Sequence, residues 1–205
     1  YLFGIVMYMM KKMTELNDDL FYLGIDGGAT KTEAVIVDGD KQVLGRGFGE
    51  GANPHNMPLD VVFANIIKAV NEARQNAVRE YSGRQIGEYE TVCMGMAGID
   101  TDYDREQLKQ FINSKSVNEK TFGGKKFYLV NDGLVGFKSG SQADFGVCLV
   151  SGTGSNCYGL TKDGREALAG DWGYVLGDQG SSYAMGKAIL QQVMKEFDGR
   201  HSLTT

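Results

Sequence analysis

Apolar and polar positions along residues 20–141 predict a domain that mixes strands and helices. Three short apolar runs separated by Gly/Asp turns are typical of strands, at 21–26, 33–38 and 43–49. Residues 59–80 carry apolar side chains at three- and four-residue spacing, which predicts an amphipathic helix. Four further elements are expected in the order strand, helix, strand, helix, at 91–98, 104–113, 126–132 and 133–139. The predicted order is therefore βββαβαβα.

A second pattern of the same kind begins near residue 145. The segment FGVCLVSGTGSNCYGLTKDG resembles FYLGIDGGATKTEAVIVDGD, because both place a glycine/hydroxyl turn between two apolar strands and close with an Asp-Gly turn. A last helix is expected to begin near Ser181, with an apolar face made by Tyr183, Ile189, Val193 and Phe197. We therefore expect one α/β domain at 20–141, and at 142–205 the N-terminal part of a second, similar domain that this chain truncates.

Composition narrows the class of protein. Hydrophobic residues make up 42% and charged residues 23%, which excludes a disordered chain and a bundle of membrane helices. The chain has 29 glycines among 205 residues, twice the usual share of about 7%, and only 2 prolines, so many tight backbone positions are expected inside an ordered fold. The net charge is −5 and basic residues do not cluster, so a nucleic-acid partner is not expected.

The cysteines and the N-terminal stretch favour a cytoplasmic protein. Cys93, Cys148 and Cys157 lie in apolar runs and form no C-x-x-C pair, so buried, reduced thiols are expected. Residues 1–19 hold an apolar run too short to span a bilayer, and the lysines follow this run where a signal peptide would have them first. We interpret 1–19 as an N-terminal extension or a short element packed on the body, and expect no membrane association.

Two glycine turns carry the candidate chemistry. In the first, glycine amides and threonine hydroxyls can bind an anion, a lysine adds positive charge, and Asp26 can hold Mg²⁺ through water. Its residues are Asp26, Gly27, Gly28, Thr30, Lys31 and Thr32. By itself this pattern fits an ordinary hairpin turn equally well. A second such turn at 151–156 makes the pair more specific, because a phosphate chain between two domains would meet one turn from each side, as phosphoryl transfer requires.

Asp132 follows an apolar strand and precedes a predicted helix. A carboxylate at this point can take a proton from a substrate hydroxyl. Its ordinary pKa makes it a weak base, so it would act late, as the hydroxyl becomes acidic. The alternative is that Asp132 is a helix N-cap without catalytic function.

Five motifs in order, GIDGGATKTEAVIVD, GMAGID, VNDG, SGTGSN and GDWGYVLGDQGSSYAMG, resemble the actin/Hsp70/sugar-kinase superfamily. Within it, residues 21–198 resemble the BadF/BadG/BcrA/BcrD-type ATPases, and most closely the N-acetylglucosamine kinases. The resemblance implies an actin-like ATPase (ribonuclease H-like) α/β fold. It further implies ATP and Mg²⁺ as cofactors, and transfer of phosphate to the 6-hydroxyl of N-acetylglucosamine or a related amino sugar.

The resemblance also implies roles for individual residues. Thr30 and Thr153 would contact ATP, with Gly152 and Gly154 in the second phosphate loop, and Asp132 would be the general base. The sugar would be bound by Asn53, His55, Asp132, Ser155, Asn156, Asp171, Trp172, Gly173 and Asp178. For Trp172 the alternative is core packing, and for His55 it is a solvated loop position.

Two other functions stay open at this point. The same phosphate loops would serve an ATPase switch that acts on a protein partner. The family continues past Thr205, so a catalytically inactive sugar-binding fragment is the second alternative. The lack of a cysteine pair argues against the related iron–sulfur activators of dehydratases. A small-molecule sugar is the expected partner, and the resemblance is compatible with a homodimer.

Overall fold

The computed structural model describes residues 20–80, 86, 88–119, 122, 124–141 and 143–200. The predicted extension at 1–19 lies outside these residues. The chain divides into two compact units between Ala143 and Asp144. They are called the first and the second unit below, and each is described by itself.

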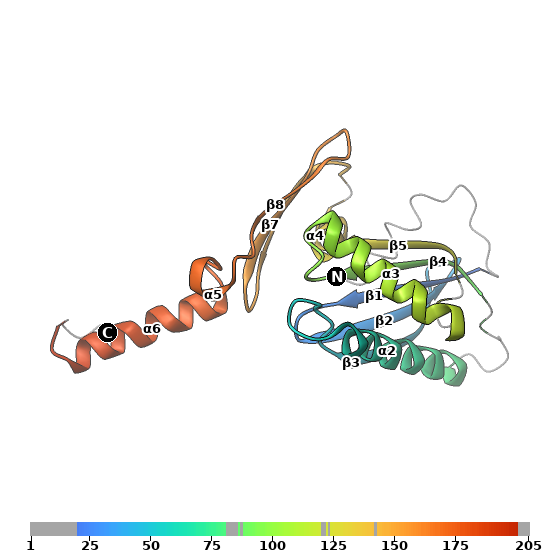
Figure 1. The fold of residues 1–205 in the computed structure, drawn as a ribbon, viewed down its shortest axis with the longest axis horizontal. Coiled ribbons are helices and arrows are strands. Elements are labelled where there is room, and N and C mark those ends of the chain that lie inside the picture. Colours follow the sequence, from blue (N-terminus) through green and yellow to red (C-terminus); the bar gives the residue numbers. More distant parts are fainter. Residues whose placement is uncertain are drawn as a thin grey trace. The chain divides into compact units, whose positions relative to one another are not determined.

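The first unit contains a five-stranded sheet with helices on both faces (Figure 1). Its elements are β1 (Phe21–Gly27), β2 (Lys31–Asp38), β3 (Val43–Glu50), α2 (Leu59–Glu80), β4 (Tyr89–Met96), α3 (Asp102–Glu119), β5 (Gly124–Asn131) and α4 (Asp132–Gly140). The strand order is β3-β2-β1-β4-β5. β1, β2 and β3 are antiparallel neighbours, whereas β4 and β5 run parallel to β1. The predicted βββαβαβα order and the α/β class are confirmed.

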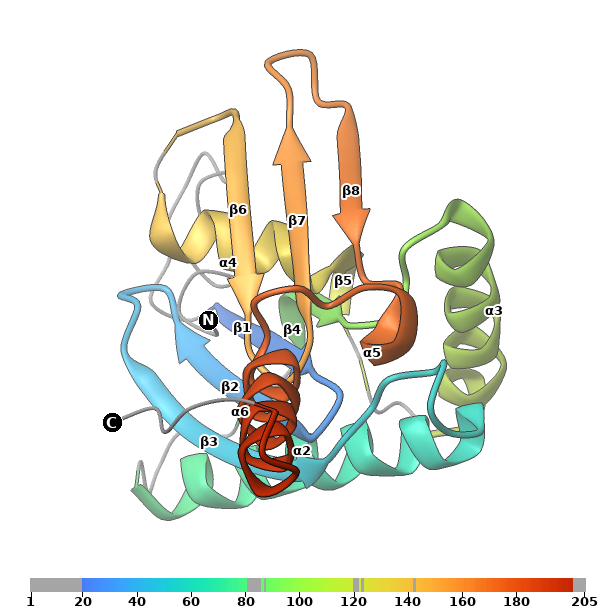
Figure 2. The ribbon, with the colours of Figure 1, turned by 90° about the vertical axis from the view of Figure 1, so that its left-hand side faces the viewer.

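Side chains alternate between the two faces of this sheet, as the strand pattern requires. Leu23 and Ile25 of β1 are fully buried in the larger core with apolar residues of α2 and α3. Tyr22 of β1 belongs to the smaller core on the opposite face, with Val135 of α4. Figure 2 shows α2 and α4 on opposite sides of the sheet. Both faces are therefore covered, and the edge of the sheet where β1, β4 and β5 end remains for a site.

Glycines of β3 let α2 lie directly against the sheet. A Cβ added at Gly45 would lie 2.2 Å from the carbonyl oxygen of Ala73, and one at Gly47 would lie 2.1 Å from that of Ala69. Real Cβ atoms do not approach backbone so closely, so these positions require glycine. Part of the glycine excess is thus explained by helix–sheet packing and not by ligand binding.

The second unit contains a three-stranded antiparallel sheet in the order β6-β7-β8, followed by two helices. Its elements are β6 (Gly146–Ser151), β7 (Ser155–Leu160), β8 (Glu166–Gly170), α5 (Gly173–Leu176) and α6 (Ser182–Phe197). The β6–β7 hairpin was predicted, but β8 and α5 were not, because both are short and lack a clear apolar pattern. Ser181 caps α6 by accepting a hydrogen bond from Ala184 N (3.1 Å), so the expected start of this helix is confirmed.

One sequence expectation needs correction in the second unit, namely that its cysteines are buried. The apolar side chains of α6 recur as predicted, yet they are exposed: Ile189 is 64% and Phe197 87% accessible. Cys148 and Cys157 are only partly buried, and of the three cysteines, all of which the structure describes, Cys93 alone is buried. The spacing of apolar residues in α6 and in the strands indicates which face is apolar. Whether that face is buried depends on what packs against it.

The helices of the described residues lack the continuous apolar length that a bilayer crossing needs.

Candidate active site

The candidate site lies where the parallel strands β1, β4 and β5 end. Gly27 pairs with Met96, and Met96 pairs with Asn131, so the carboxyl ends of the three strands are level with one another. Ligands of open α/β sheets bind beside such strand ends. The segments that leave this edge are the first glycine turn, the loop 97–100 and the start of α4.

The first glycine turn is tightly tied to its surroundings. Gly28 N donates to Lys31 O (3.0 Å) and closes the turn between β1 and β2, while Ala52 N donates to Gly28 O (2.9 Å). A Cβ at Gly51 would lie 2.2 Å from Ala29 O, so the loop after β3 packs directly against the turn. The turn therefore has a fixed backbone, which a phosphate-binding loop needs.

The threonines of this turn have different surroundings. Thr30 is exposed, and so is Lys31, whose ammonium lies 3.9 Å from a Glu33 carboxylate oxygen. Thr32 is fully buried and its hydroxyl donates to Glu50 O (2.7 Å). The hydroxyl proton of Thr32 is thus engaged in a hydrogen bond to the end of β3. Of the two predicted hydroxyl donors, only Thr30 is exposed at the turn.

Asp26 lies at the end of β1 and is partly buried. Burial raises the pKa of its carboxyl, and the negative charge of Glu33 on the paired strand adds to the rise, although Lys31 opposes it. A cation would favour the ionised form. The described residues contain no cluster of three His, Cys, Asp or Glu that could cage a metal. A single carboxylate fits Mg²⁺, which keeps several waters and takes its remaining ligands from substrate phosphates.

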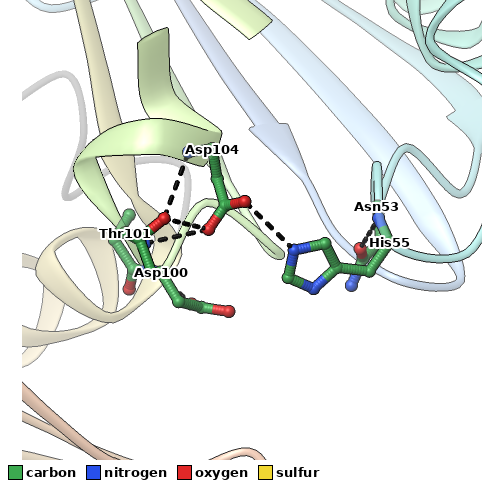
Figure 3. A network of polar contacts seen from close by, with 6 residues as sticks. Asn53, His55, Asp100, Thr101 and Asp104 are labelled. Carbon is green, nitrogen blue, oxygen red and sulfur yellow. Dashed lines mark hydrogen bonds and ion pairs between the residues drawn. The ribbon is translucent and has the colours of Figure 1, made fainter. Parts of the chain in front are cut away.

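The loop after β3 carries Asn53 and His55, both predicted to bind sugar. Asn53 Oδ1 accepts a hydrogen bond from His55 N (2.8 Å), which shapes the loop (Figure 3). Gly98 faces this amide: its φ is +75° and an added Cβ would lie 2.2 Å from Asn53 Oδ1. His55 Nε2 lies 3.6 Å from Asp104 Oδ1, so His55 has an acidic neighbour on α3 and is not a purely solvated loop residue.

Asp104 is held in place by Thr101 at the start of α3. Thr101 N and Oγ1 donate to Asp104 Oδ2 (3.0 and 2.6 Å), and Asp104 N donates to Thr101 Oγ1 (3.1 Å). This is the reciprocal arrangement of a capping box, with Asp in the acidic position. Burial acts to raise the pKa of Asp104, but the Thr101 hydrogen bonds and the adjacent His55 hold it below its usual value.

The start of α4 tests one of the two roles predicted for Asp132, that of the helix N-cap. Asn131, which is 1% exposed, is the N-cap: its Oδ1 accepts from Gly133 N (2.8 Å). Its Nδ2 donates to Asp100 Oδ1 (2.9 Å). Asp132 is the first residue of the helix and is partly buried. The alternative that Asp132 itself is the N-cap is therefore wrong, because Asn131 already performs that task.

The second glycine turn joins β6 to β7 in the second unit. Gly152 N donates to Gly154 O (2.9 Å) and closes it, and Ser155 N donates to Asp178 Oδ1 (3.2 Å). Three more hydrogen bonds join the same segments, from Ser155 Oγ to Gln179 O, from Ser151 Oγ to Gly180 O and from Ser182 N to Gly152 O. Thr153, at the tip, is exposed. The turn is thus bound to the segment that precedes α6.

Asp178, predicted to bind sugar, is the centre of this arrangement. It is 7% exposed and has a φ of 59°. A Cβ at Gly154 would lie 3.1 Å from Asp178 Oδ2, so Gly154 leaves room for this carboxylate. Within the second unit Asp178 orients the glycine turn.

Of the other predicted sugar residues of the second unit, Asp171, Trp172 and Gly173 are exposed, whereas Asn156 is partly buried. Trp172 is 74% exposed, which excludes core packing within the described residues. Asp171 is exposed with a φ of 61°, and its backbone N donates to Ser155 O (3.2 Å). Gly173, with a φ of 73°, begins α5. Asn156 Oδ1 is buried and has no hydrogen-bond partner among the described residues.

Sequence reasoning missed Asp100, Thr101, Asp104 and the capping role of Asn131. The motif GMAGID ends at Asp100, so a signal was present. Its partner Asn131 lies 31 residues away, and only the parallel pairing of β4 with β5 brings the two together.

Comparisons with known proteins agree with this architecture. The model of the BadF/BadG/BcrA/BcrD ATPase family matches residues 23–205. The chain is 33% identical over 184 residues to an N-acetyl-D-glucosamine kinase of Dictyostelium discoideum, covering 86% of this chain and 55% of that protein. It is 31% identical over 184 residues to an N-acetylmuramic acid/N-acetylglucosamine kinase of Clostridium acetobutylicum, covering 90% of this chain and 56% of that protein.

A solved structure gives the same result for the fold. A Chromobacterium violaceum protein assigned as an N-acetylglucosamine kinase superposes with a TM-score of 0.66 at 25% identity, covering 91% of this chain and 61% of that one. The chain spans about half the length of the curated relatives it matches. The fold is that of the actin-like ATPases, and the chain belongs to the BadF/BadG/BcrA/BcrD ATPase family.

Proposed function

We propose that the protein containing this chain is an ATP-dependent kinase that phosphorylates the 6-hydroxyl of N-acetylglucosamine or a related amino sugar. The observation that carries the proposal is Asp132, a partly buried carboxylate at the carboxyl ends of parallel strands that is not needed as a helix cap. The two curated relatives, named for N-acetylglucosamine and N-acetylmuramic acid, support the choice of sugar.

The nucleotide side of the reaction uses the glycine turns. The amides of Gly27 and Gly28 and the exposed Thr30 and Lys31 would hold phosphate oxygens, with Asp26 holding the hydrated Mg²⁺. When bound, MgATP would supply the γ-phosphoryl group, and its Mg²⁺ would offset the negative charge of the phosphate oxygens. The exposed turn with Gly152, Thr153 and Gly154 would bind phosphate in the same way. Thr32 would support the turn by holding it to the end of β3, since its hydroxyl already donates to Glu50 O.

The sugar side uses polar side chains and one aromatic ring. We propose sugar-binding roles for Asn53 and His55 in the first unit, and for Asp171, Trp172, Gly173 and Asn156 in the second. Amides and carboxylates bind ring hydroxyls, and an exposed indole offers an apolar face to a pyranose. Asp178 and Ser155 are assigned to orienting the second turn, because Ser155 N donates to Asp178 Oδ1 and Ser155 Oγ donates to Gln179 O.

Asp132 would accept the proton of the 6-hydroxyl while that oxygen bonds to the γ-phosphorus and the bond to ADP breaks. An ordinary carboxylate is a weak base, so the transfer comes late, when the hydroxyl has become acidic. Water must be kept from the same carboxylate, since otherwise ATP would be hydrolysed. The partial burial of Asp132 favours the sugar hydroxyl over bulk water.

The direct test is sugar-dependent ADP release by the protein expressed from its complete reading frame. N-acetylglucosamine, N-acetylmuramic acid, glucosamine and glucose form the panel. Release that requires an amino sugar supports the proposal. ATP hydrolysis that ignores sugar and rises with a protein partner would instead indicate the ATPase switch, and sugar binding without turnover would indicate an inactive binding protein.

The variant Asp132→Asn separates catalysis from binding. We expect kcat to fall by about 10²–10⁴-fold, the usual contribution of a general base, with the sugar Kd changed by less than about twofold. Calorimetry gives the Kd and a coupled assay gives kcat. Asp102→Asn is the control, because the Asp102 side chain is fully exposed on α3. An active Asp132→Asn variant would remove Asp132 from the role of base.

Two finer assignments belong to the proposal. We expect a cytoplasmic protein, to be checked by fractionation. A homodimer is compatible with the family resemblance, and light scattering would measure it.

A further inference from the structure

We propose that Asp100 is a positioning residue of this site, which fixes Asn131 and through it the first turn of α4 that carries Asp132. The inference rests on the proposed function, because Asp132 must be the base for its position to affect turnover. Asp100 itself ends the loop after β4 and is partly buried.

Both polar atoms of the Asn131 side-chain amide make a hydrogen bond. Its Oδ1 accepts from Gly133 N (2.8 Å), and its Nδ2 donates to Asp100 Oδ1 (2.9 Å). A primary amide has one accepting and one donating end. If it flipped, its NH₂ group would face the Gly133 N–H and its oxygen would face the Asp100 carboxylate, so both contacts would be lost. Asp100 therefore selects the amide orientation that caps α4.

Asp100 can do this because its own backbone is fixed. Ala97 N donates to Gly27 O (2.9 Å), which ties the loop to the end of β1. Gly98 packs against Asn53, and Ile99 is fully buried in the main core. The next residue, Thr101, opens the capping box of α3. The loop is anchored by its backbone, a packed side chain and a helix start, which is the support that a precise catalytic geometry needs.

Loss of this contact should slow the chemical step while sugar binding is kept. A misplacement of about 1 Å can cost on the order of 10²-fold in rate. Asn131→Asp keeps the capping oxygen, removes the donor and places two carboxylates together. We expect kcat to fall by about 10–100-fold, with the sugar Kd changed by less than about twofold.

A swapped pair gives the sharpest test. In the double variant Asp100→Asn/Asn131→Asp, the amide at position 100 can donate to the carboxylate at 131, which still caps Gly133. The Asp100→Asn single variant is the reference, because its amide oxygen still accepts from Asn131. We expect the kcat of the double variant to recover to within about fivefold of the kcat of this single variant. Asp102→Asn, two residues from Asp100 and fully exposed, is the matched control and should match the wild type.

The experiment measures kcat by coupled ADP release and sugar Kd by calorimetry, on the wild type and these four variants of the complete protein. Recovery in the swapped pair at constant Kd supports the inference. An unchanged kcat in Asn131→Asp, a failure of the double variant to recover, or a sugar Kd weakened more than tenfold in Asp100→Asn would overturn it. A wild type without sugar-dependent turnover would overturn the proposed function and this inference together, whereas an active wild type isolates the inference.

Discussion

At the scale of single residues, the site combines groups whose surroundings separate their roles. Asn131 caps α4, so Asp132 is the first residue of the helix and not its cap. The Thr32 hydroxyl donates a hydrogen bond to the backbone of β3, whereas Thr30 is exposed. Asp178 orients a turn, whereas Trp172 is open to solvent. Residues of similar type in neighbouring positions therefore have different surroundings, which their burial and their hydrogen-bond partners distinguish.

Because the pKa of Asp26 is raised, we expect the stability of the folded chain to depend on pH. Burial raises its pKa, so the folded chain holds this proton more tightly than the unfolded chain. The free energy of unfolding therefore falls as the pH rises from the ordinary carboxyl pKa of the unfolded chain through the raised pKa of the folded chain. Asp26→Asn removes the loss, so we expect a higher Tm than the wild type at pH 7.5 and a smaller difference at pH 4.5.

Thermal melts at the two pH values check this, with Asp102→Asn as the exposed control. The Asp26 variant should also lose stabilisation by MgATP if Asp26 holds the cation. A Tm at pH 7.5 equal to or below that of the wild type would show that the buried charge is compensated in the folded chain.

At the scale of elements, the closest packing in the first unit is that of α2 on β3. Gly45 and Gly47 leave no space between strand and helix backbone. The strand that makes this contact leads into the loop that carries Asn53 and His55.

Gly47→Ala should therefore destabilise the first unit. The added Cβ would lie 2.1 Å from Ala69 O, which requires α2 to move away from the sheet. Overpacking of this kind costs about 1–3 kcal/mol. Gly140→Ala is the matched control, because nothing lies within 4 Å of its added Cβ. Denaturant unfolding measures both, and equal midpoints for the two variants would contradict the packing argument.

At the scale of the whole molecule, the two units differ in their cores. The first has a large core on one face of its sheet and a smaller one on the other. Among the described residues of the second unit, Tyr158 is the only buried hydrophobic side chain, whereas Leu149, Leu190 and other large apolar side chains are exposed. Because apolar burial drives folding, the two units should differ in autonomous stability.

A fragment of residues 20–143 should unfold in one cooperative transition. A fragment of residues 144–205 should bind a hydrophobic dye and melt without a cooperative transition. Circular dichroism and dye fluorescence of the two separate fragments check this. A sharp melt of the 144–205 fragment would show that its apolar residues pack in a way that the structure does not contain.

Much of the fold was predictable from local sequence. Short apolar runs between Gly/Asp turns predicted β1 and β2, and helical spacing predicted α2 with the bounds that the structure has. Gly/hydroxyl turns between apolar strands identified both glycine turns. β8 and α5 were missed, since five and four residues hold too little periodic pattern. The start of α3 was placed two residues late, because its capping pair was not recognised.

The sequence by itself determined the α/β class, the order of elements in the first unit and the positions of the glycine turns. These depend on the period of apolar residues and on backbone freedom, which are local properties. Only the tertiary structure decided that Asn131 caps α4, that Asp100 holds Asn131, and that Gly45 and Gly47 serve helix packing. The last two assignments depend on which elements pack together and on contacts between residues 22 to 31 positions apart in the chain, and no local spacing contains that information.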